Sequence, residues 1–300
     1  MASESSYYVP ESSWYPVVAA TSLGLLAVGG GLAVQGGTSL PLIAGLALLA
    51  FVLFCWFNTV IQENMQGLPS AQLKRSYVMG MSWFIFSEVM FFAAFFGALF
   101  YVRTLAVPWL GGEGDKAMTN ELLWPGFEAQ WPLMLTPDQS AGGTQFIGPH
   151  ENMGFPGWDK LLGWLPLWNT IILLTSSWTV HIAHHALKHD NRSRFNLFLG
   201  ITVALGLAFI YVQYLEYHEA YVDMGLTLES GIYGTTFFML TGFHGFHVCL
   251  GTFMLLIQLI RGLRGHFKAD DQFGFEASSW YWHFVDVVWV GLFIYVYVLG

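Results

Sequence analysis

Residues 76–102 read SYVMGMSWFIFSEVMFFAAFFGALFYV, a run of 27 residues with a single charged side chain, that of Glu88. About 20 consecutive apolar residues are enough for an α-helix to cross the hydrocarbon core of a bilayer. This stretch therefore predicts a transmembrane helix with a carboxyl group near its middle. A charge at that depth costs at least ~2.5 kcal/mol on insertion scales, so such residues usually face protein or carry a function.

Glu88 has no basic residue one helical turn away. The positions three and four residues distant are Phe84, Ile85, Phe91 and Phe92, and such neighbours share one face of a helix. Apolar surroundings favour the neutral form of a carboxyl group. Two interpretations stay open: Glu88 is a proton-linked or gating group, or it is a neutral group that hydrogen-bonds to another helix for structural reasons.

The composition is that of a membrane protein. Of the 300 residues, 55% are hydrophobic and 10% are charged, against about 25% charged in soluble proteins. We therefore expect an all-α, polytopic membrane protein with seven spans. The predicted spans are Tyr15–Val34, Leu40–Ile61, Ser76–Val102, Trp164–Leu187, Phe195–Tyr217, Ile232–Ile260 and Ala277–Leu299.

Basic residues indicate the orientation. Eight of the eleven Lys and Arg residues lie in loops on one side: Lys74, Arg75, Lys188, Arg192, Arg194, Arg261, Arg264 and Lys268. By the positive-inside rule this side is cytoplasmic, which puts the N-terminus inside and the C-terminus outside. The first 16 residues lack the basic region and the cleavage site of a signal peptide.

The chain divides into four segments. Residues 1–62 hold the N-terminal tail and a hairpin of the first two helices, and residues 63–103 hold an inner loop and the third helix. Residues 104–163 form a hydrophilic, extramembrane (periplasmic) insert rich in glycine and proline, in which no helical or strand period persists. Residues 164–300 contain the last four helices.

Acidic residues gather on the predicted outer side, where eleven acids oppose three bases. A field of this sign attracts a basic soluble partner. The alternative interpretation is an ordinary solvated surface. The group Glu216–Glu219 is interpreted as part of a solvated acidic rim at the end of the fifth helix.

Histidines form two groups that suggest a metal site, since imidazole is a common ligand of copper, zinc and iron. The groups are His181, His184 and His185 in the fourth helix, and His244 and His247 in the sixth. The first group lies among cationic side chains at a helix C-terminus, where the helix dipole alone favours histidine. We therefore expect no metal in this chain.

Buried polar groups need partners, so we expect Glu88 to contact one of the two histidines of the sixth helix. In the last helix, His283 and Asp286 are three residues apart and share a face, which predicts a structural polar pair. The aromatic residues 280–282 favour anchoring at the membrane interface.

The chain contains no Walker loop, dinucleotide-binding turn or nucleophile elbow, and we assign no catalytic residue and no nucleic-acid partner.

Four segments, in this order, carry a family resemblance: RSYVMGMSWFIFSEVMFF (75–92), TSSWTVHIAHHALKHDNR (175–192), GIYGTTFFMLTGFHGFHVCLG (231–251) and FGFEASSWYWHFVDVVWV (273–290). Together they resemble subunit III of haem–copper cytochrome c oxidase of the bacterial aa3 type. The resemblance implies two bundles, helices 1–2 and 3–7, with lipids in the cleft between them. It implies a non-catalytic chain without cofactors of its own, which binds phospholipids and packs on subunits I and II of an oxidase supplied by cytochrome c.

The resemblance also assigns roles to residues. Glu88 matches the buried, carbodiimide-reactive glutamate of the family, and His244 matches the histidine thought to pair with it along a dioxygen route. Trp56 and Phe57 fall at the cleft entrance, where members often carry two tryptophans. The insert is longer than the loop of mitochondrial members, which indicates a bacterial protein of the inner membrane.

Two other functions are considered. Third subunits of quinol oxidases are similar but typically lack the first two helices, which this chain contains. A free-standing, proton-coupled transporter would use Glu88 together with further acids along a path, and only Asp286 also lies deep in a span. Co-purification with haem-bearing subunits distinguishes an oxidase subunit from a transporter.

Overall fold

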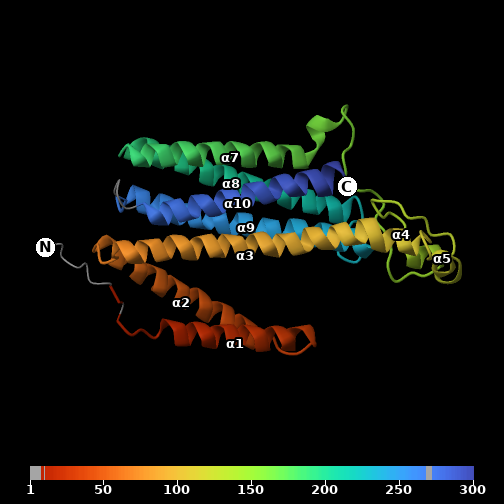
Figure 1. Ribbon diagram of the computed structural model, residues 1–300, viewed down its shortest axis with the longest axis horizontal. Helices are drawn as coiled ribbons and strands as arrows, with labels where there is room; N and C mark the ends of the chain where they lie inside the picture. The colour runs from red at the N-terminus through yellow and green to blue at the C-terminus, as the bar shows by residue number, and fades with distance from the viewer. Residues whose placement is uncertain (1–7, 10, 268–271) are drawn as a thin grey trace. The chain divides into compact units, whose positions relative to one another are not determined.

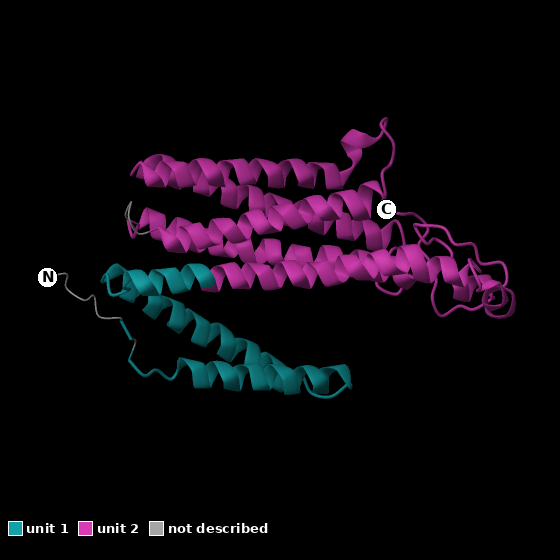
Figure 2. Ribbon diagram, viewed as in Figure 1, with its two compact units in different colours: residues 1–79 teal, residues 80–300 magenta. Residues whose placement is uncertain are grey.

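The chain folds into α-helices joined by turns and loops. The computed structural model describes residues 8, 9, 11–267 and 272–300, and these contain no β-strand, so the all-helical prediction is confirmed. They divide into two compact units, residues 1–79 and 80–300 (Figure 2). The first seven residues of the predicted tail, and Lys268 among the predicted inner bases, lie outside the described residues.

The first unit contains a hairpin of α1 (Tyr15–Val34) and α2 (Leu40–Met65) (Figure 1). Glycines let the two backbones touch: a Cβ atom added to Gly29 would lie 2.1 Å from the Leu42 nitrogen. A Cβ atom added to Gly45 would lie 2.9 Å from a backbone nitrogen of α1. Small residues at such crossings suit helix packing in lipid, where van der Waals contact replaces the hydrophobic effect.

The helix that carries Glu88 extends beyond its predicted span at both ends. Its parts are α3 (Ala71–Tyr101), the π-helical segment η1 (Val102–Ala106) and α4 (Val107–Leu110). The predicted span, Ser76–Val102, stopped at charged residues, but a helix can leave the membrane without interruption. The π-helical segment ends two residues before Pro108, which has no N–H group to donate to the helical ladder.

Four helices of the second unit pack in a ring. They are α7 (Leu165–Lys188), α8 (Arg192–Val222), α9 (Gly231–Leu263) and α10 (Phe273–Leu292), which continues as the π-helical segment η3 (Phe293–Val298). Each of α7, α8 and α9 contacts the next helix, and α10 contacts α7. The part of α3 in this unit lies along α9 and α10 (Figure 1), where Phe91 meets Phe243 at a centroid distance of 5.0 Å.

Trp282 of α10 fills the centre of this ring and is fully buried. Glycines make room for its indole ring: a Cβ atom added to Gly251 of α9 would lie 2.8 Å from a ring carbon, and one added to Gly206 of α8 would lie 3.1 Å from another. The membrane anchoring predicted for residues 280–282 is therefore wrong for the side chains of Tyr281 and Trp282, which are both fully buried. These rings pack between helices because their neighbours leave space for them.

α7 lacks a stretch as long and apolar as those in the other long helices. Six helices of the described residues are long and apolar enough to span a membrane, and α7 is not among them, so the count of seven stays a prediction. Polar groups of α7 pair with α8 and α10 instead of facing lipid. These pairs are Ser176–Trp282, Thr179–Thr202 and Thr170–Trp289, at 3.0, 2.8 and 3.0 Å. Polar groups satisfied inside a bundle are tolerated at membrane depth.

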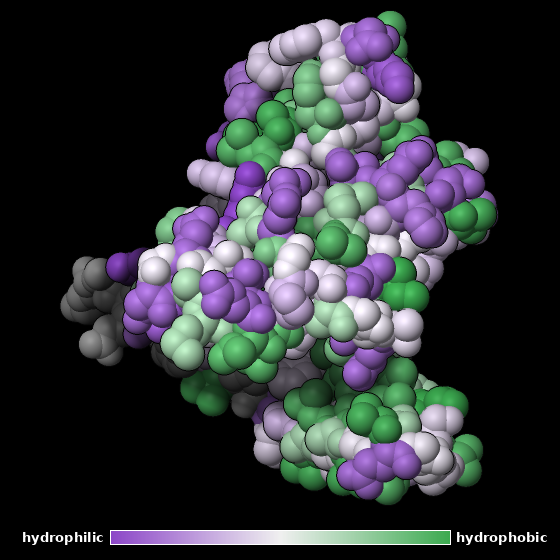
Figure 3. Space-filling model, turned by 90° about the vertical axis from the view of Figure 1, so that its right-hand side faces the viewer, coloured by the Kyte–Doolittle hydropathy of each residue, from purple (hydrophilic) through white to green (hydrophobic). Residues whose placement is uncertain are grey.

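Beyond Leu110, the hydrophilic segment of residues 104–163 contains short helices joined by irregular chain. These are α5 (Ala117–Leu123), α6 (Pro137–Ser140) and the 3₁₀ turn η2 (Leu161–Gly163). Backbone contacts attach the segment to the bundle: Met153 N donates to Tyr233 Oη at 3.1 Å, and His150 N donates to Met224 O at 2.8 Å. At this end of the second unit, hydrophilic side chains are interspersed with hydrophobic ones (Figure 3).

Candidate functional site

Glu88 and His247 form a hydrogen-bonded pair between α3 and α9. Glu88 Oε2 lies 3.0 Å from His247 Nε2. The His247 side chain is 8% exposed and the Glu88 side chain 23% exposed. The expected contact between Glu88 and a histidine of this helix is therefore present, and it joins two helices that are distant in sequence.

Aromatic rings surround the imidazole of His247. Phe92 and Phe91 of α3 lie 5.0 and 6.0 Å from it, measured between ring centroids. Tyr281 of α10 stacks on it at 6.2 Å, with 18° between the planes, and Phe284 lies at 6.2 Å. Three helices thus build an apolar enclosure, and a hydrogen bond in such low-dielectric surroundings is electrostatically stronger than in water.

The hydrogen bonds of His247 determine how many protons the pair holds. Its Nδ1 lies 2.6 Å from the carbonyl oxygen of Phe243, which can only accept, so Nδ1 carries a proton. Nε2 then either accepts a proton from neutral Glu88 or, in a cationic imidazole, donates to a carboxylate. The net charge is zero in both forms. The pair can therefore move one proton between its members without leaving an uncompensated charge in the membrane.

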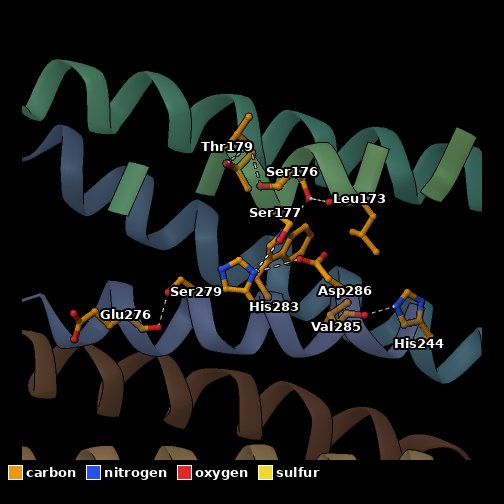
Figure 4. Close-up of polar contacts among 12 residues, drawn as sticks. Leu173, Ser176, Ser177, Thr179, His244, Glu276, Ser279, His283, Val285 and Asp286 are labelled. Carbon is orange, nitrogen blue, oxygen red and sulfur yellow. Dashed lines mark hydrogen bonds and ion pairs between the residues drawn. The ribbon is translucent and has the colours of Figure 1, made fainter. Parts of the chain in front are cut away.

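His244 faces α10 instead of α3. Its Nε2 donates to the carbonyl oxygen of Val285 at 3.2 Å (Figure 4), and its ring packs on Trp289 at 5.0 Å. Successive helical residues are rotated by about 100°, so side chains three residues apart point in directions that differ by about 60°. The resemblance assigned the pairing to His244; here His247 is the partner of Glu88.

His283 and Asp286 make the contact that their spacing predicted. His283 Nδ1 lies 3.5 Å from Asp286 Oδ2 and 2.9 Å from Ser177 Oγ of α7 (Figure 4). Asp286 is buried, whereas the His283 side chain is 41% exposed. Serine and aspartate face the same ring nitrogen, so this is not a catalytic triad, which uses both nitrogens of the histidine. The three residues connect α10 to α7.

Trp56 and Phe57 lie on α2 in the first unit. Trp56 stacks on Tyr15 of α1, with ring centroids 5.9 Å apart and 17° between the planes. The Tyr15 hydroxyl lies 2.7 Å from Thr59 Oγ1, which joins the same two helices. Both candidate residues are exposed, and their role at a lipid cleft stays a prediction.

The histidines of α7 have partners other than a metal ion. His184 Nε2 lies 3.2 Å from Glu276 Oε1 of α10, and His185 stacks on His189 at 4.3 Å. Within residues 8, 9, 11–267 and 272–300, no three His, Cys, Asp or Glu side chains come together in a way that could hold a metal ion. That the chain binds no metal stays a prediction.

The solvated position expected for Glu216 is wrong. Its side chain is completely buried, and α8 continues to Val222, more than one turn beyond it. Tyr297 donates a hydrogen bond to Glu216 Oε1, and so does Gln213 at 3.4 Å. Gln213 and Glu216 are three positions apart and follow a largely apolar stretch of α8, which is the sequence signal that could have identified this buried group.

Comparison with known proteins covers almost the whole chain. The family model described as cytochrome c oxidase subunit III matches residues 5–115 and 156–300. Cytochrome c oxidase subunit 3 of Latimeria chalumnae is 36% identical over 296 residues, which are 98% of this chain and 97% of that protein. The proteins of the same name from Hippopotamus amphibius and Scyliorhinus canicula are each 35% identical, with the same coverage. The chain therefore belongs to the cytochrome c oxidase subunit III family.

Proposed function

We propose that this chain is the non-catalytic third subunit of a proton-pumping cytochrome c oxidase in an aerobic respiratory chain. It stabilises subunit I, contacts subunit II, holds phospholipids and supports dioxygen access and proton uptake, while haem and copper reside in the partner subunits. The observation that carries the proposal is the enclosed Glu88–His247 pair in a chain of this family. A pair that shares one proton at zero net charge suits an auxiliary role in proton handling.

We place the chain in the inner membrane of a bacterium, with its N-terminus in the cytoplasm and its C-terminus in the periplasm. The turn between α7 and α8, with Lys188, Arg192 and Arg194, lies at one end of the second unit, and residues 111–163 lie at the other (Figure 1). This separation supports cytoplasmic and periplasmic sides as the positive-inside rule predicts them.

Purification through a tag on this chain tests the proposed function. After gentle solubilisation, the chain should co-purify with subunits that give the absorption spectrum of haem, and cytochrome c should reduce that complex. A chain that is recovered alone and intact, without haem-bearing partners, would instead indicate a free-standing transporter. A haem-bearing complex that accepts electrons only from quinol would indicate a quinol oxidase.

Replacing Glu88 by alanine should destabilise the chain by about 1–3 kcal/mol, because the buried Nε2 of His247 loses its partner. Glu88→Gln should be tolerated better, since the amide N–H can donate to the same nitrogen. The measurement is thermal unfolding of the purified complex. The matched control is Ser87→Ala on the same helix, because the exposed Ser87 hydroxyl donates to Phe84 O within α3 and joins no second helix among the described residues.

A double-mutant cycle isolates this contact. In a chain that already carries His247→Leu, Glu88→Ala should add little further destabilisation, because contacting residues are energetically coupled. Fully additive effects of the two substitutions would contradict the pairing. The cycle also separates His247 from His244, since His244→Leu should leave the full effect of Glu88→Ala in place.

The hydrophilic segment carries four exposed acids: Glu113, Asp115, Glu121 and Glu128. Lys116 Nζ donates to Asp115 Oδ2 at 3.2 Å, and this hydrogen bond lowers the pKa of Asp115, which is therefore charged at neutral pH. We propose that these acids attract a basic electron donor such as cytochrome c. Replacing all four by their amides should slow donor association at low salt. The effect should vanish at high salt, since charges are screened within about 8 Å at physiological ionic strength.

Stopped-flow measurement of donor association at several salt concentrations tests this steering. Glu63→Gln together with Asp190→Asn is the control, because these acids lie on the predicted cytoplasmic side and should leave the rate unchanged. The alternative interpretation is that the segment only covers neighbouring subunits. A rate that is unchanged at low ionic strength, with the complex intact, would support that alternative.

A further inference from the structure

A line of polar side chains crosses the second unit from α7 through α8 to η3. Asn169 Nδ2 donates to Gln213 Oε1 at 3.4 Å, and Gln213 Nε2 donates to Glu216 Oε1 at 3.4 Å. The Tyr297 hydroxyl donates to the same oxygen of Glu216. All four side chains are buried within this chain alone, so no partner subunit is needed to keep the cluster away from bulk water.

Two oxygen atoms of this cluster lack a hydrogen-bond partner among the residues that the structure describes. They are Glu216 Oε2 and Asn169 Oδ1, and both are buried. The direction of the hydrogen bonds explains why, since the amide and hydroxyl donors all point to the other two oxygens. Each buried polar atom without a partner costs about 1–3 kcal/mol. The two unsatisfied oxygens could therefore be satisfied by one additional proton and one small hydrogen-bonding ligand.

The surroundings of Glu216 do not compensate a negative charge. In the described part of the chain no ion pair includes Glu216. The charged side chain that acts on it is Glu219, another acid one turn later in α8. The phenols of Tyr297 and Tyr217 are also neighbours of Glu216. A buried carboxylate without a cation is among the costliest groups in a protein interior, whereas a neutral acid removes that cost.

We propose that Glu216 is a second proton-holding site of this chain: a neutral acid with its proton on Oε2 and a bound water molecule as its ligand. The water accepts the hydrogen bond from Oε2 and donates one to Asn169 Oδ1, so a single molecule satisfies both oxygens. This site differs from the Glu88–His247 pair, in which an imidazole shares the proton. It rests on contacts within the chain and is independent of the proposed oxidase function.

Infrared spectroscopy of the purified complex tests the proposal. The wild type should show a protonated-carboxyl C=O stretching band that shifts in D₂O and is lost in Glu216→Gln. Glu88→Gln is the matched control, because it removes any contribution of Glu88, another carboxyl within a membrane helix, and should leave the Glu216 band in place. Tyr297→Phe removes a hydrogen bond to Oε1 and should move the band to higher wavenumber without abolishing it.

Several results would overturn the proposal. The first is that Glu216→Gln removes a carboxylate band and not a protonated-carboxyl band. The second is that Glu216→Gln leaves the protonated-carboxyl band unchanged. The bound water is contradicted if Asn169→Ala does not shift the band. Folding is checked separately: glutamine supplies the same acceptor and donor as a neutral acid, so the melting temperature of Glu216→Gln should match that of the wild type. A marked fall would indicate an ionised carboxylate.

Discussion

An oxidase assembled without this chain should reduce dioxygen at a nearly normal initial rate but lose its activity several-fold sooner during turnover. Because haem and copper are proposed to reside in the partner subunits, the initial chemistry should depend on those subunits. The proposed role of the helices and their lipids is to cover a flank of the catalytic subunit. Following dioxygen consumption until activity ends measures the initial rate and the working life of the enzyme in one experiment.

The comparison requires complexes with equal haem content. A complex that carries Glu88→Gln is a useful intermediate, since it retains the covering helices and changes only the proton-sharing pair. If the helices provide the protection, this variant should have a working life closer to that of the wild type than to that of the depleted complex. Immediate and complete loss of dioxygen reduction on removal of the chain would show that the proposed auxiliary role is wrong.

Replacing Trp282 by alanine should destabilise the second unit by about 3–5 kcal/mol, the usual cost of deleting a buried aromatic side chain. The indole ring is fully buried, and its Nε1 donates to Ser176 Oγ, so the substitution leaves both a cavity and a lost hydrogen bond. Gly251→Val should also destabilise the bundle, because the new side chain overlaps the space that the ring occupies. Thermal unfolding of the complex measures both effects.

Trp158→Ala is the matched control for this prediction. Trp158 is 83% exposed, so the same chemical change there should have little effect on the melting temperature of the chain. Equal destabilisation by the two substitutions would mean that Trp282 does not have the central packing role inferred from its neighbours. A Trp282→Phe variant should lie between the wild type and the alanine variant, since it retains a ring but loses the hydrogen bond to Ser176.

Local properties of the sequence were sufficient for much of the fold. The length and apolarity of residues 76–102 identified a membrane helix and placed Glu88 inside it. The three-residue spacing of His283 and Asp286 predicted a contact, because two positions on one helix have a known separation whatever surrounds them. The quoted segments identified the family for the same reason, since they are properties of the chain itself.

Other features depended on how one helix is rotated against its neighbours. Both His244 and His247 were possible partners of Glu88, and only the orientation of α9 between α3 and α10 directs His247 to the carboxyl group. Hydropathy likewise placed Glu216 at a solvated helix end, whereas packing against η3 buries it with Tyr297.

The sequence by itself thus determined the class of fold, the family and the position of Glu88 within a long apolar helix. The tertiary structure decided which histidine pairs with Glu88, that Glu216 is buried and that Trp282 occupies a slot between two glycines. The physical reason is that hydropathy and helical spacing are properties of one helix. The partners of a buried group are set by side chains that other helices bring to it.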